Sequence, residues 1–206
     1  MNEQEHIKYP TVLEKIKLDS EALGFQMACD SLTGSLLKTL AASKPKGMFL
    51  ELGTGTGVST AWVLDGMDED SQLISIENNV TVASVAKKYL EYDRRVKFQI
   101  EDAASWLNQV VNKKFDLIFA DAWVGKYSHL EQALNLLKIG GLYVVDDMLP
   151  QPNWPSVDHA TKVQELISAL ENTEDLVLTK MNWSTGIVIA TKLNSTAPTL
   201  KTNDTD

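Results

Sequence analysis

The chain has 206 residues, 44% of them hydrophobic, and a formal net charge of −9. This length and apolar content predict one domain with a sizeable core. The acidic balance argues against a nucleic-acid substrate, because binding to phosphates depends on Lys and Arg. No stretch approaches the roughly 18 consecutive apolar residues of a membrane-spanning helix.

Residues 11–23 and 27–42 have the apolar spacing of helices. Strands and helices alternate after residue 47, which favours βαβ units and a parallel sheet. The expected strands are 48–52, 72–77, 96–100, 115–120 and 142–146, and the helices between them are 59–66, 80–89, 103–111 and 129–137.

The pattern changes after residue 147, where three prolines predict an irregular loop. We expect a helix at 157–170, followed by strands at 176–181 and 186–191 that close the sheet as an antiparallel hairpin. One domain at 1–193 is predicted, with a helical cap at 1–45 and an α/β core at 46–193. The polar tail 194–206 is expected to be disordered.

The N-terminus lacks the basic and then apolar pattern of a secretory signal. The single cysteine, Cys29, excludes an internal disulfide and fits a reducing compartment. Cys29 falls in a helical pattern and is expected to be a packed, small apolar residue. These features predict a cytoplasmic protein.

Residues 48–61 read MFLELGTGTGVSTA, which predicts a strand, a glycine turn and a helix. Such a turn lets the backbone approach a ligand closely and suggests an adenosine-type cofactor. Its glycines are Gly53, Gly55 and Gly57. A carboxylate at Glu51 would repel a pyrophosphate and suits a cation, such as the amino group of S-adenosylmethionine. Ser59 and the helix N-terminus are placed to hold that cofactor's carboxylate.

Acidic residues stand at the carboxyl ends of the expected parallel strands. They are Glu51, Glu77, Asp102, Asp121, Asp146 and Asp147. Ligands of open α/β sheets bind beyond this edge. An acid at the end of the second strand, Glu77, can accept hydrogen bonds from both ribose hydroxyls. Asp102, after the third strand, is placed to contact the adenine amino group.

From about residue 48 to 192, the chain resembles the S-adenosylmethionine-dependent O-methyltransferases of the catechol and caffeoyl-CoA type. LELGTGTGVST is similar to their first cofactor motif, and LISIEN to their ribose-binding motif. FDLIFADAWVGKY and GGLYVVDDM are similar to the fourth and fifth motifs, and GIVIATK to the last strand. The resemblance implies a Rossmann-like class I methyltransferase fold, with a seven-stranded, mostly parallel sheet, a C-terminal antiparallel hairpin and helices on both faces. It also implies methyl transfer to a hydroxyl of a small acceptor, with catechol-like molecules as one candidate class, and a homodimer.

The resemblance implies roles for individual residues. Those expected to bind the cofactor are Glu51, Gly53, Thr54, Gly55, Gly57, Ser59, Glu77, Asp102, Ala103, Asp121 and Trp123. Trp123 also stands where catechol-type members line the acceptor pocket. Asp121, Asp146 and Asp147 are the implied ligands of a divalent cation, normally Mg²⁺.

Two departures from the family pattern concern catalysis. The family carries Lys, as general base, where this chain has Val124, so Lys126 is a candidate replacement and Asp121 a second proton acceptor. Asp147 stands where the family has Asn. Three carboxylates either hold the metal more firmly or leave one acid turned away or protonated, so a metal-free variant stays open. His159 is a further candidate base, and Trp154 a candidate acceptor-pocket residue.

Three other functions remain open from the sequence. An RNA (tRNA or rRNA) methyltransferase would need a basic surface beside the site and would lose binding as salt rises. A Rossmann-type dehydrogenase would bind NAD, although the glycine spacing and Glu51 count against it. A non-catalytic adenosyl-cofactor-binding domain would bind the cofactor without turnover.

Overall fold

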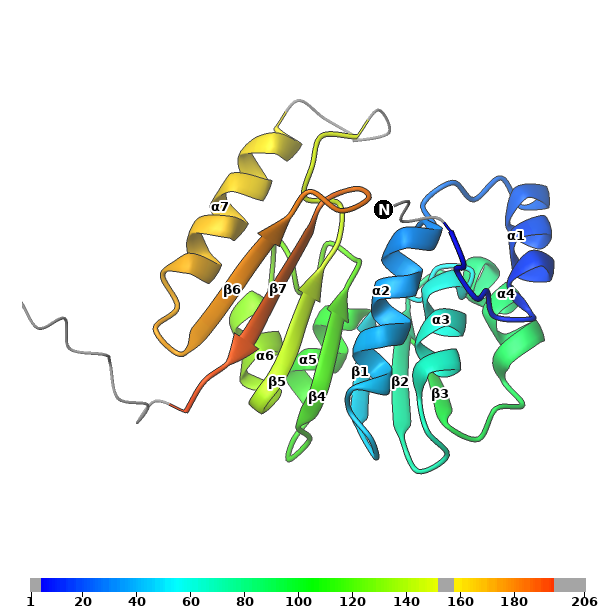
Figure 1. Ribbon diagram of the computed structural model, residues 1–206, viewed down its shortest axis with the longest axis horizontal. Helices are drawn as coiled ribbons and strands as arrows, with labels where there is room; N and C mark the ends of the chain where they lie inside the picture. The colour runs from blue at the N-terminus through cyan, green and yellow to red at the C-terminus, as the bar shows by residue number, and fades with distance from the viewer. Residues whose placement is uncertain (1–4, 152–157, 195–206) are drawn as a thin grey trace, which may run out of the picture.

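The computed structural model describes residues 5–151 and 158–194 (Figure 1). The elements are α1 (Leu13–Ala22), α2 (Ser31–Ala42), β1 (Met48–Leu52), α3 (Val58–Gly66), β2 (Gln72–Glu77), α4 (Val80–Leu90), β3 (Val96–Ile100), α5 (Ala103–Gln109), β4 (Phe115–Ala120), α6 (Leu130–Asn135), β5 (Leu137–Val145), α7 (His159–Glu171), β6 (Leu176–Met181) and β7 (Ile187–Lys192). Within these ranges, no helix has the length and apolar character needed to cross a bilayer.

One seven-stranded sheet runs through the molecule in the order β3-β2-β1-β4-β5-β7-β6. The first five strands of this order pair in parallel, whereas β7 is antiparallel to both β5 and β6. The predicted mostly parallel sheet with a closing antiparallel pair is therefore confirmed. The chain leaves β1 toward one edge of the sheet and later returns to β4 beside β1. A ligand crevice is expected at such a switch point, beyond the carboxyl ends of β1 and β4.

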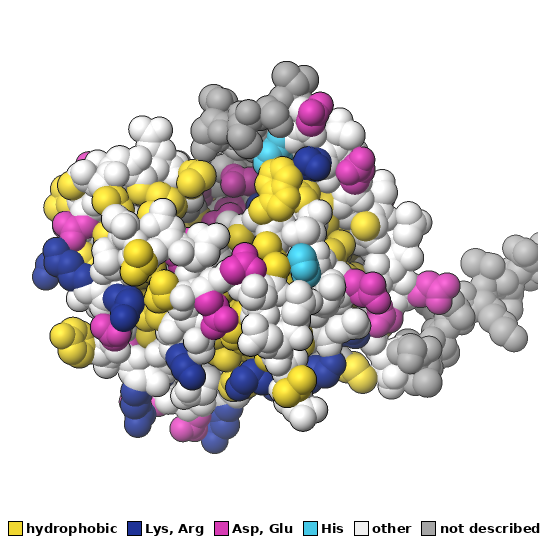
Figure 2. Space-filling view, turned by 180° about the vertical axis from the view of Figure 1, so that it is seen from behind, with side chains coloured by type: hydrophobic (Ala, Val, Ile, Leu, Met, Phe, Trp, Pro, Cys, Tyr) yellow, Lys and Arg dark blue, Asp and Glu magenta, His cyan; other side chains and the backbone are white. Residues whose placement is uncertain are grey.

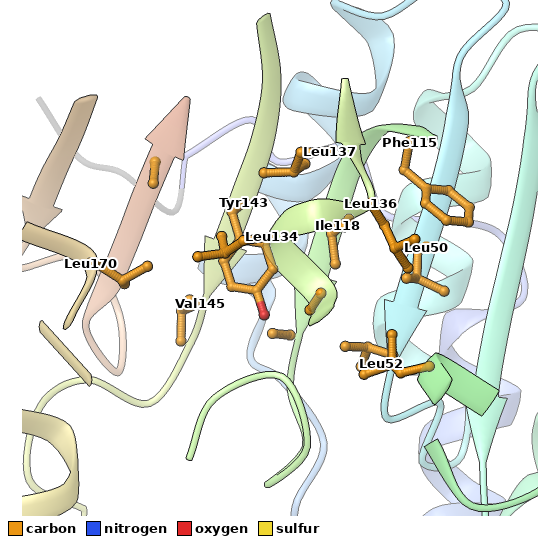
Figure 3. Close-up of a cluster of buried hydrophobic side chains, with 14 of the residues drawn as sticks. Leu50, Leu52, Phe115, Ile118, Leu134, Leu136, Leu137, Tyr143, Val145 and Leu170 are labelled. Atoms are coloured by element: carbon orange, nitrogen blue, oxygen red, sulfur yellow. The ribbon is translucent and has the colours of Figure 1, made fainter. Parts of the chain in front are cut away.

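Helices cover both faces of the sheet and bury two apolar cores. α5, α6 and α7 pack on one face, where Leu50, Ile118 and Tyr143 lie at the centre of the core (Figure 3). α1, α2, α3 and α4 cover the other face, around Phe49 and Phe119. Because both faces are covered, the central strands are nearly continuous apolar runs. This packing fixes the strand ends that carry the acidic residues.

Two of the expected helices are shorter than predicted for reasons that the structure shows. The helix expected at 27–42 begins at Ser31, because the Asp30 carboxylate accepts hydrogen bonds from the backbone N–H groups of Leu32 and Thr33. Residues 25–30 are therefore non-helical, and Cys29 is buried as expected but outside a helix. The helix expected at 129–137 ends at Asn135, and Leu137 instead opens β5 by pairing with Phe115.

The remaining boundaries agree with the predicted ones to within a few residues, as helix and strand ends usually do. The predicted Trp154, the predicted helix start at Val157 and tail residues 195–206 lie outside the described residues.

Candidate functional site

A cleft of about 570 Å³ opens beyond the carboxyl ends of β1, β2, β4 and β5. Figure 2 shows acidic side chains gathered in a hollow at the upper edge of the molecule. The predicted site residues that line the cleft are Gly53, Thr54, Gly55, Ser59, Glu77, Asp121, Trp123, Lys126, Asp146, Asp147 and His159. Those that do not are Glu51, Gly57, Asp102 and Ala103. Most of the predicted site is thus brought together at one edge of the sheet.

Glu77, at the end of β2, braces the glycine turn. Its Oε2 accepts a hydrogen bond from the Gly55 N–H at 3.0 Å, and its Oε1 accepts one from the Asn79 N–H at 3.0 Å. The backbone N–H groups of Gly53 and Thr54 both donate to the Ile76 carbonyl at 3.0 Å. The carboxylate therefore faces the cleft while it holds two of the turns that line it.

The glycines of this turn are required by the protein's own packing. Gly53 has φ of 100°, and a Cβ there would lie 2.8 Å from the Asp121 carbonyl oxygen. Gly57 has φ of 91°, and its Cβ would lie 2.7 Å from the Ala86 Cβ. These positive φ angles and close approaches favour glycine. The turn thus brings the end of β1 against the end of β4, and the start of α3 against α4.

Glu51 lies beneath the cleft rather than on its wall. The residue is fully buried, and its Oε2 accepts hydrogen bonds from the Thr60 hydroxyl at 2.6 Å and the Ser75 hydroxyl at 2.5 Å. Burial raises the pKa of the Glu51 carboxyl to about 7, although the surrounding hydroxyls oppose that rise. The Glu51 carboxylate thus bonds to α3 and β2 and does not line the cleft, and its predicted contact with the cofactor stays a prediction.

Asp146 and Lys126, which are buried, and Asp121, which is largely buried, lie together beyond the ends of β4 and β5. Burial raises the Asp121 pKa well above its usual value, Asp146 and Asp147 raise it further, and Lys126 counteracts the rise. Burial likewise raises the pKa of Asp146 to about 6. Asp146 Oδ1 accepts hydrogen bonds from the Thr185 hydroxyl at 2.5 Å and from the Asp147 N–H at 2.8 Å.

The donor set does not fit the expected divalent cation. Within the described residues, no three His, Cys, Asp or Glu side chains are placed together to hold a metal ion. Asp146 Oδ1 is engaged by two protein donors, and the Lys126 Nζ, which is 6% exposed, lies 3.9 Å from Asp121 Oδ1. The Asp121, Asp146 and Asp147 carboxylates thus share the cleft with an ammonium, and a divalent cation held by these three residues stays a prediction from the sequence.

Three rings form a cluster at the cleft rim. Trp123 and Tyr127 meet edge to face, with ring centroids 4.8 Å apart, and His159 meets Tyr127 in the same manner at 5.2 Å. The Tyr127 hydroxyl and His159 Nε2 are 3.0 Å apart. Burial lowers the pKa of His159, and the nearby Lys126 lowers it further. Trp123 is 47% exposed, so the cluster presents an aromatic surface to an incoming molecule.

Asp102 caps α5 and does not line the cleft. Its Oδ1 accepts hydrogen bonds from the Ser105 N–H at 2.8 Å and the Ser105 hydroxyl at 2.9 Å, and Ala103 is the first residue of that helix. The structure thus gives Asp102 a capping role, and its contact with adenine stays a prediction.

Changing Asp102 to Ala separates these two roles. The loss of the cap should lower the thermal stability modestly and leave the affinity for S-adenosylhomocysteine unchanged. Calorimetric titration and a melting curve of the same preparation measure both quantities. A clear loss of affinity at unchanged stability would restore the contact with adenine.

The cleft also contains residues that sequence reasoning did not select. Tyr127 lines the cleft, and the sequence signal for it was the aromatic residue that ends the fourth motif. Residues 25–30 close one side of the cleft, and Thr185 reaches Asp146 from the β6–β7 turn. Residues 25–30 and Thr185 belong to no recognisable sequence motif, because only the tertiary packing brings them to the cleft.

The profile of the O-methyltransferase family matches residues 5–193. A putative O-methyltransferase from Mycolicibacterium vanbaalenii is 31% identical over 123 residues, which cover 57% of this chain and 54% of that protein. A catechol O-methyltransferase from Niastella koreensis is 32% identical over 123 residues, covering 56% of each chain. The aligned region spans little more than half the length of these curated relatives.

Solved structures share the fold. The O-methyltransferase TomG from Streptomyces achromogenes, in complex with SAM, has a TM-score of 0.79 at 22% identity, over 92% of this chain and 93% of that one. The O-methyltransferase from Bacillus cereus, in complex with SAH, has a TM-score of 0.80 at 20% identity, over 91% and 93%. The family match extends through the cap, the cleft and the closing strands, and the chain therefore belongs to the O-methyltransferase family.

Proposed function

We propose that this protein transfers a methyl group from S-adenosylmethionine to a hydroxyl of a small aromatic acceptor. The observation that carries the proposal is the cleft itself, in which the glycine turn, Glu77 and the Trp123–Tyr127–His159 cluster meet beyond the carboxyl ends of the strands. Family membership and the cofactor complexes of the structural neighbours support the choice of cofactor.

The cofactor is proposed to lie between the glycine turn and the turn after β2. Glu77 would accept hydrogen bonds from the ribose hydroxyls, as acids at the end of a second strand do in related folds. Ser59, near the N-terminus of α3, and the backbone N–H groups of that helix would hold the amino acid's carboxylate. The buried carboxylates beside the cleft favour the positive charge of the sulfonium and the amino group.

The acceptor is proposed to stack on the aromatic cluster at the rim. Trp123 lines the cleft and is 47% exposed, with Lys162 Nζ over its ring at 5.2 Å, and its exposed part is the proposed contact for an aromatic acceptor. The Niastella relative is named for a catechol acceptor, and for this chain we propose the wider class of aromatic hydroxyl compounds to which catechols belong.

Methyl transfer requires loss of the acceptor's hydroxyl proton. The S–CH₃ bond breaks as the O–CH₃ bond forms in line, and the sulfonium becomes a neutral thioether that needs no proton. His159 Nδ1 is buried, and Nε2 is the ring nitrogen within reach of the Tyr127 hydroxyl. We infer that the acceptor's proton passes to the Tyr127 oxygen while the Tyr127 proton passes to His159 Nε2.

No observation favours the rival functions. The net charge of −9 argues against an RNA substrate, because binding to phosphates depends on Lys and Arg. Retention of binding without turnover across a panel of phenols would favour a non-catalytic domain, and binding of NAD would favour a dehydrogenase. A homodimer and a cytoplasmic location stay predictions from the sequence.

Changing Glu77 to Ala tests the cofactor site. We expect weaker binding of S-adenosylmethionine by about 1–3 kcal/mol, the scale for losing hydrogen bonds to a charged group. Titration calorimetry measures the change, and Glu165→Ala on the exposed face of α7 is the matched control. Equal affinities for the two variants would remove Glu77 from the site.

A further inference from the structure

Lys126 is a buried cation that the fold places among carboxylates. Its side chain is 6% exposed, and its Nζ lies 3.9 Å from Asp121 Oδ1. Its charge also lowers the pKa of both Asp121 and Asp146, as a cation close to two carboxyls does. Lys126 lines the same cleft as Asp147 and His159.

The loop after β4 is built to direct this side chain into the cleft. Gly125 has φ of 92°, and a Cβ there would lie 2.6 Å from Leu52 Cδ1. The Gly125 carbonyl accepts a hydrogen bond from the buried Tyr143 hydroxyl at 2.5 Å, and its N–H donates to the Ser128 carbonyl at 2.7 Å. Val124, where the resemblance places a lysine, instead packs against the apolar core.

We propose that the Lys126 ammonium takes the place of a divalent cation in this chain, and that it holds the acceptor's oxygen as an anion. The proposal rests on the methyltransferase function proposed above and names its acceptor class. Asp121 anchors the ammonium, and an N–H donor of the same group faces the cleft for the acceptor. Lys126 then stabilises charge, and the proton goes to His159 as described above.

The chemistry of an ammonium limits the acceptor. A divalent ion offers several coordination positions and can chelate two neighbouring oxygens, whereas an ammonium offers single hydrogen bonds and one charge. It also lowers the pKa of a hydroxyl less than a bound metal does. The acceptor class is therefore a phenol or enol with one hydroxyl that is already acidic, such as a phenol bearing an electron-withdrawing substituent. A second, neighbouring hydroxyl would add no chelating contact at this site, so a catechol would be methylated no better than a simple phenol of equal acidity.

Binding of Mn²⁺ tests whether the Lys126 ammonium takes the place of a divalent cation, and the test needs no acceptor. Lys126→Met removes the charge and keeps the length of the side chain, and Lys180→Met on the exposed strand β6 is the matched control. We expect the wild type and the control to bind Mn²⁺ weakly, and Lys126→Met to bind it at least roughly tenfold more tightly, because the ammonium no longer repels the ion from Asp121. Adding Asp121→Asn to Lys126→Met should abolish that gain. The signal of free Mn²⁺ in electron paramagnetic resonance gives the affinities.

Turnover supplies a second readout. Methyl transfer by the wild type to 4-nitrophenol should be unchanged by EDTA, and Lys126→Met should lose transfer while it still binds S-adenosylhomocysteine. Equal Mn²⁺ affinities for wild type and Lys126→Met would overturn the proposal, as would transfer that EDTA abolishes and Mg²⁺ restores. If Lys126→Met does not fold, the wild type still decides the matter, because tight binding of Mn²⁺ by the wild type would contradict the proposal. Failure of the wild type to bind S-adenosylhomocysteine would instead refute the proposed function, and the Mn²⁺ comparison would still decide the role of Lys126.

Discussion

Replacing Glu51 with Gln should make the protein more stable at about pH 8 by on the order of 3 kcal/mol, and should make little difference at about pH 5. The Glu51 carboxyl is fully buried, and its pKa rises from 4.5 to about 7. The unfolded chain releases this proton near the lower value, and the folded protein retains it until the higher one. Between these values the folded state binds more protons, so stability falls as pH rises.

Urea unfolding at several pH values measures this effect. The wild type should lose stability from about pH 5 to pH 8 more steeply than Glu51→Gln does. The pKa values of Asp121 and Asp146 are also raised, so the free energy of unfolding should still fall with rising pH in both proteins. The exposed Glu165→Gln serves as the control and should follow the wild type. If the free energy of unfolding depends on pH in the same way for Glu51→Gln and the wild type, then ionisation of the buried Glu51 does not destabilise the fold, and the prediction is wrong.

Replacing His159 with Asn should lower kcat by about 10²- to 10⁴-fold, the usual contribution of a general base. Because burial lowers the pKa of His159, its ring is neutral at neutral pH and can accept the proton. The rate of the wild type should therefore fall as the solution becomes acidic and the ring is protonated. His159→Asn should lack this acidic limb, and Tyr127→Phe should show a comparable loss because the relay is broken.

Steady-state kinetics over a range of pH provides the measurement, and cofactor affinity provides the structural control. The affinity for S-adenosylhomocysteine should be unchanged in His159→Asn. His129→Asn is a matched variant, because His129 has φ of 55°, a conformation that Asn tolerates, and lies outside the cleft lining. Full activity of His159→Asn would remove the residue from the proton path.

The strands and their order along the chain could be predicted because each central strand is an apolar run between turns. The end of each strand then located the site, since parallel strands deliver their carboxyl ends to one edge. The helix start at Ser31 was missed because the apolar spacing of residues 27–30 resembles a helix, and the Asp30 cap overrides it.

The roles of individual acids could not be predicted from position alone. Glu51 and Glu77 both end strands, but only Glu77 lines the cleft, because α3 and β2 cover Glu51 with hydroxyls. The position of Lys126 among the predicted metal ligands could not be predicted for a related reason. The sequence shows three carboxylates, whereas the turn at Gly125, which brings Lys126 among them, is a tertiary feature.

A crystal structure with S-adenosylhomocysteine tests the central claim most directly. We expect the ligand in the cleft between the glycine turn and Glu77, with the ribose hydroxyls on that carboxylate and the sulfur directed toward the Trp123–Tyr127–His159 cluster. A ligand bound elsewhere, or a cleft that stays empty at saturating ligand, would contradict it.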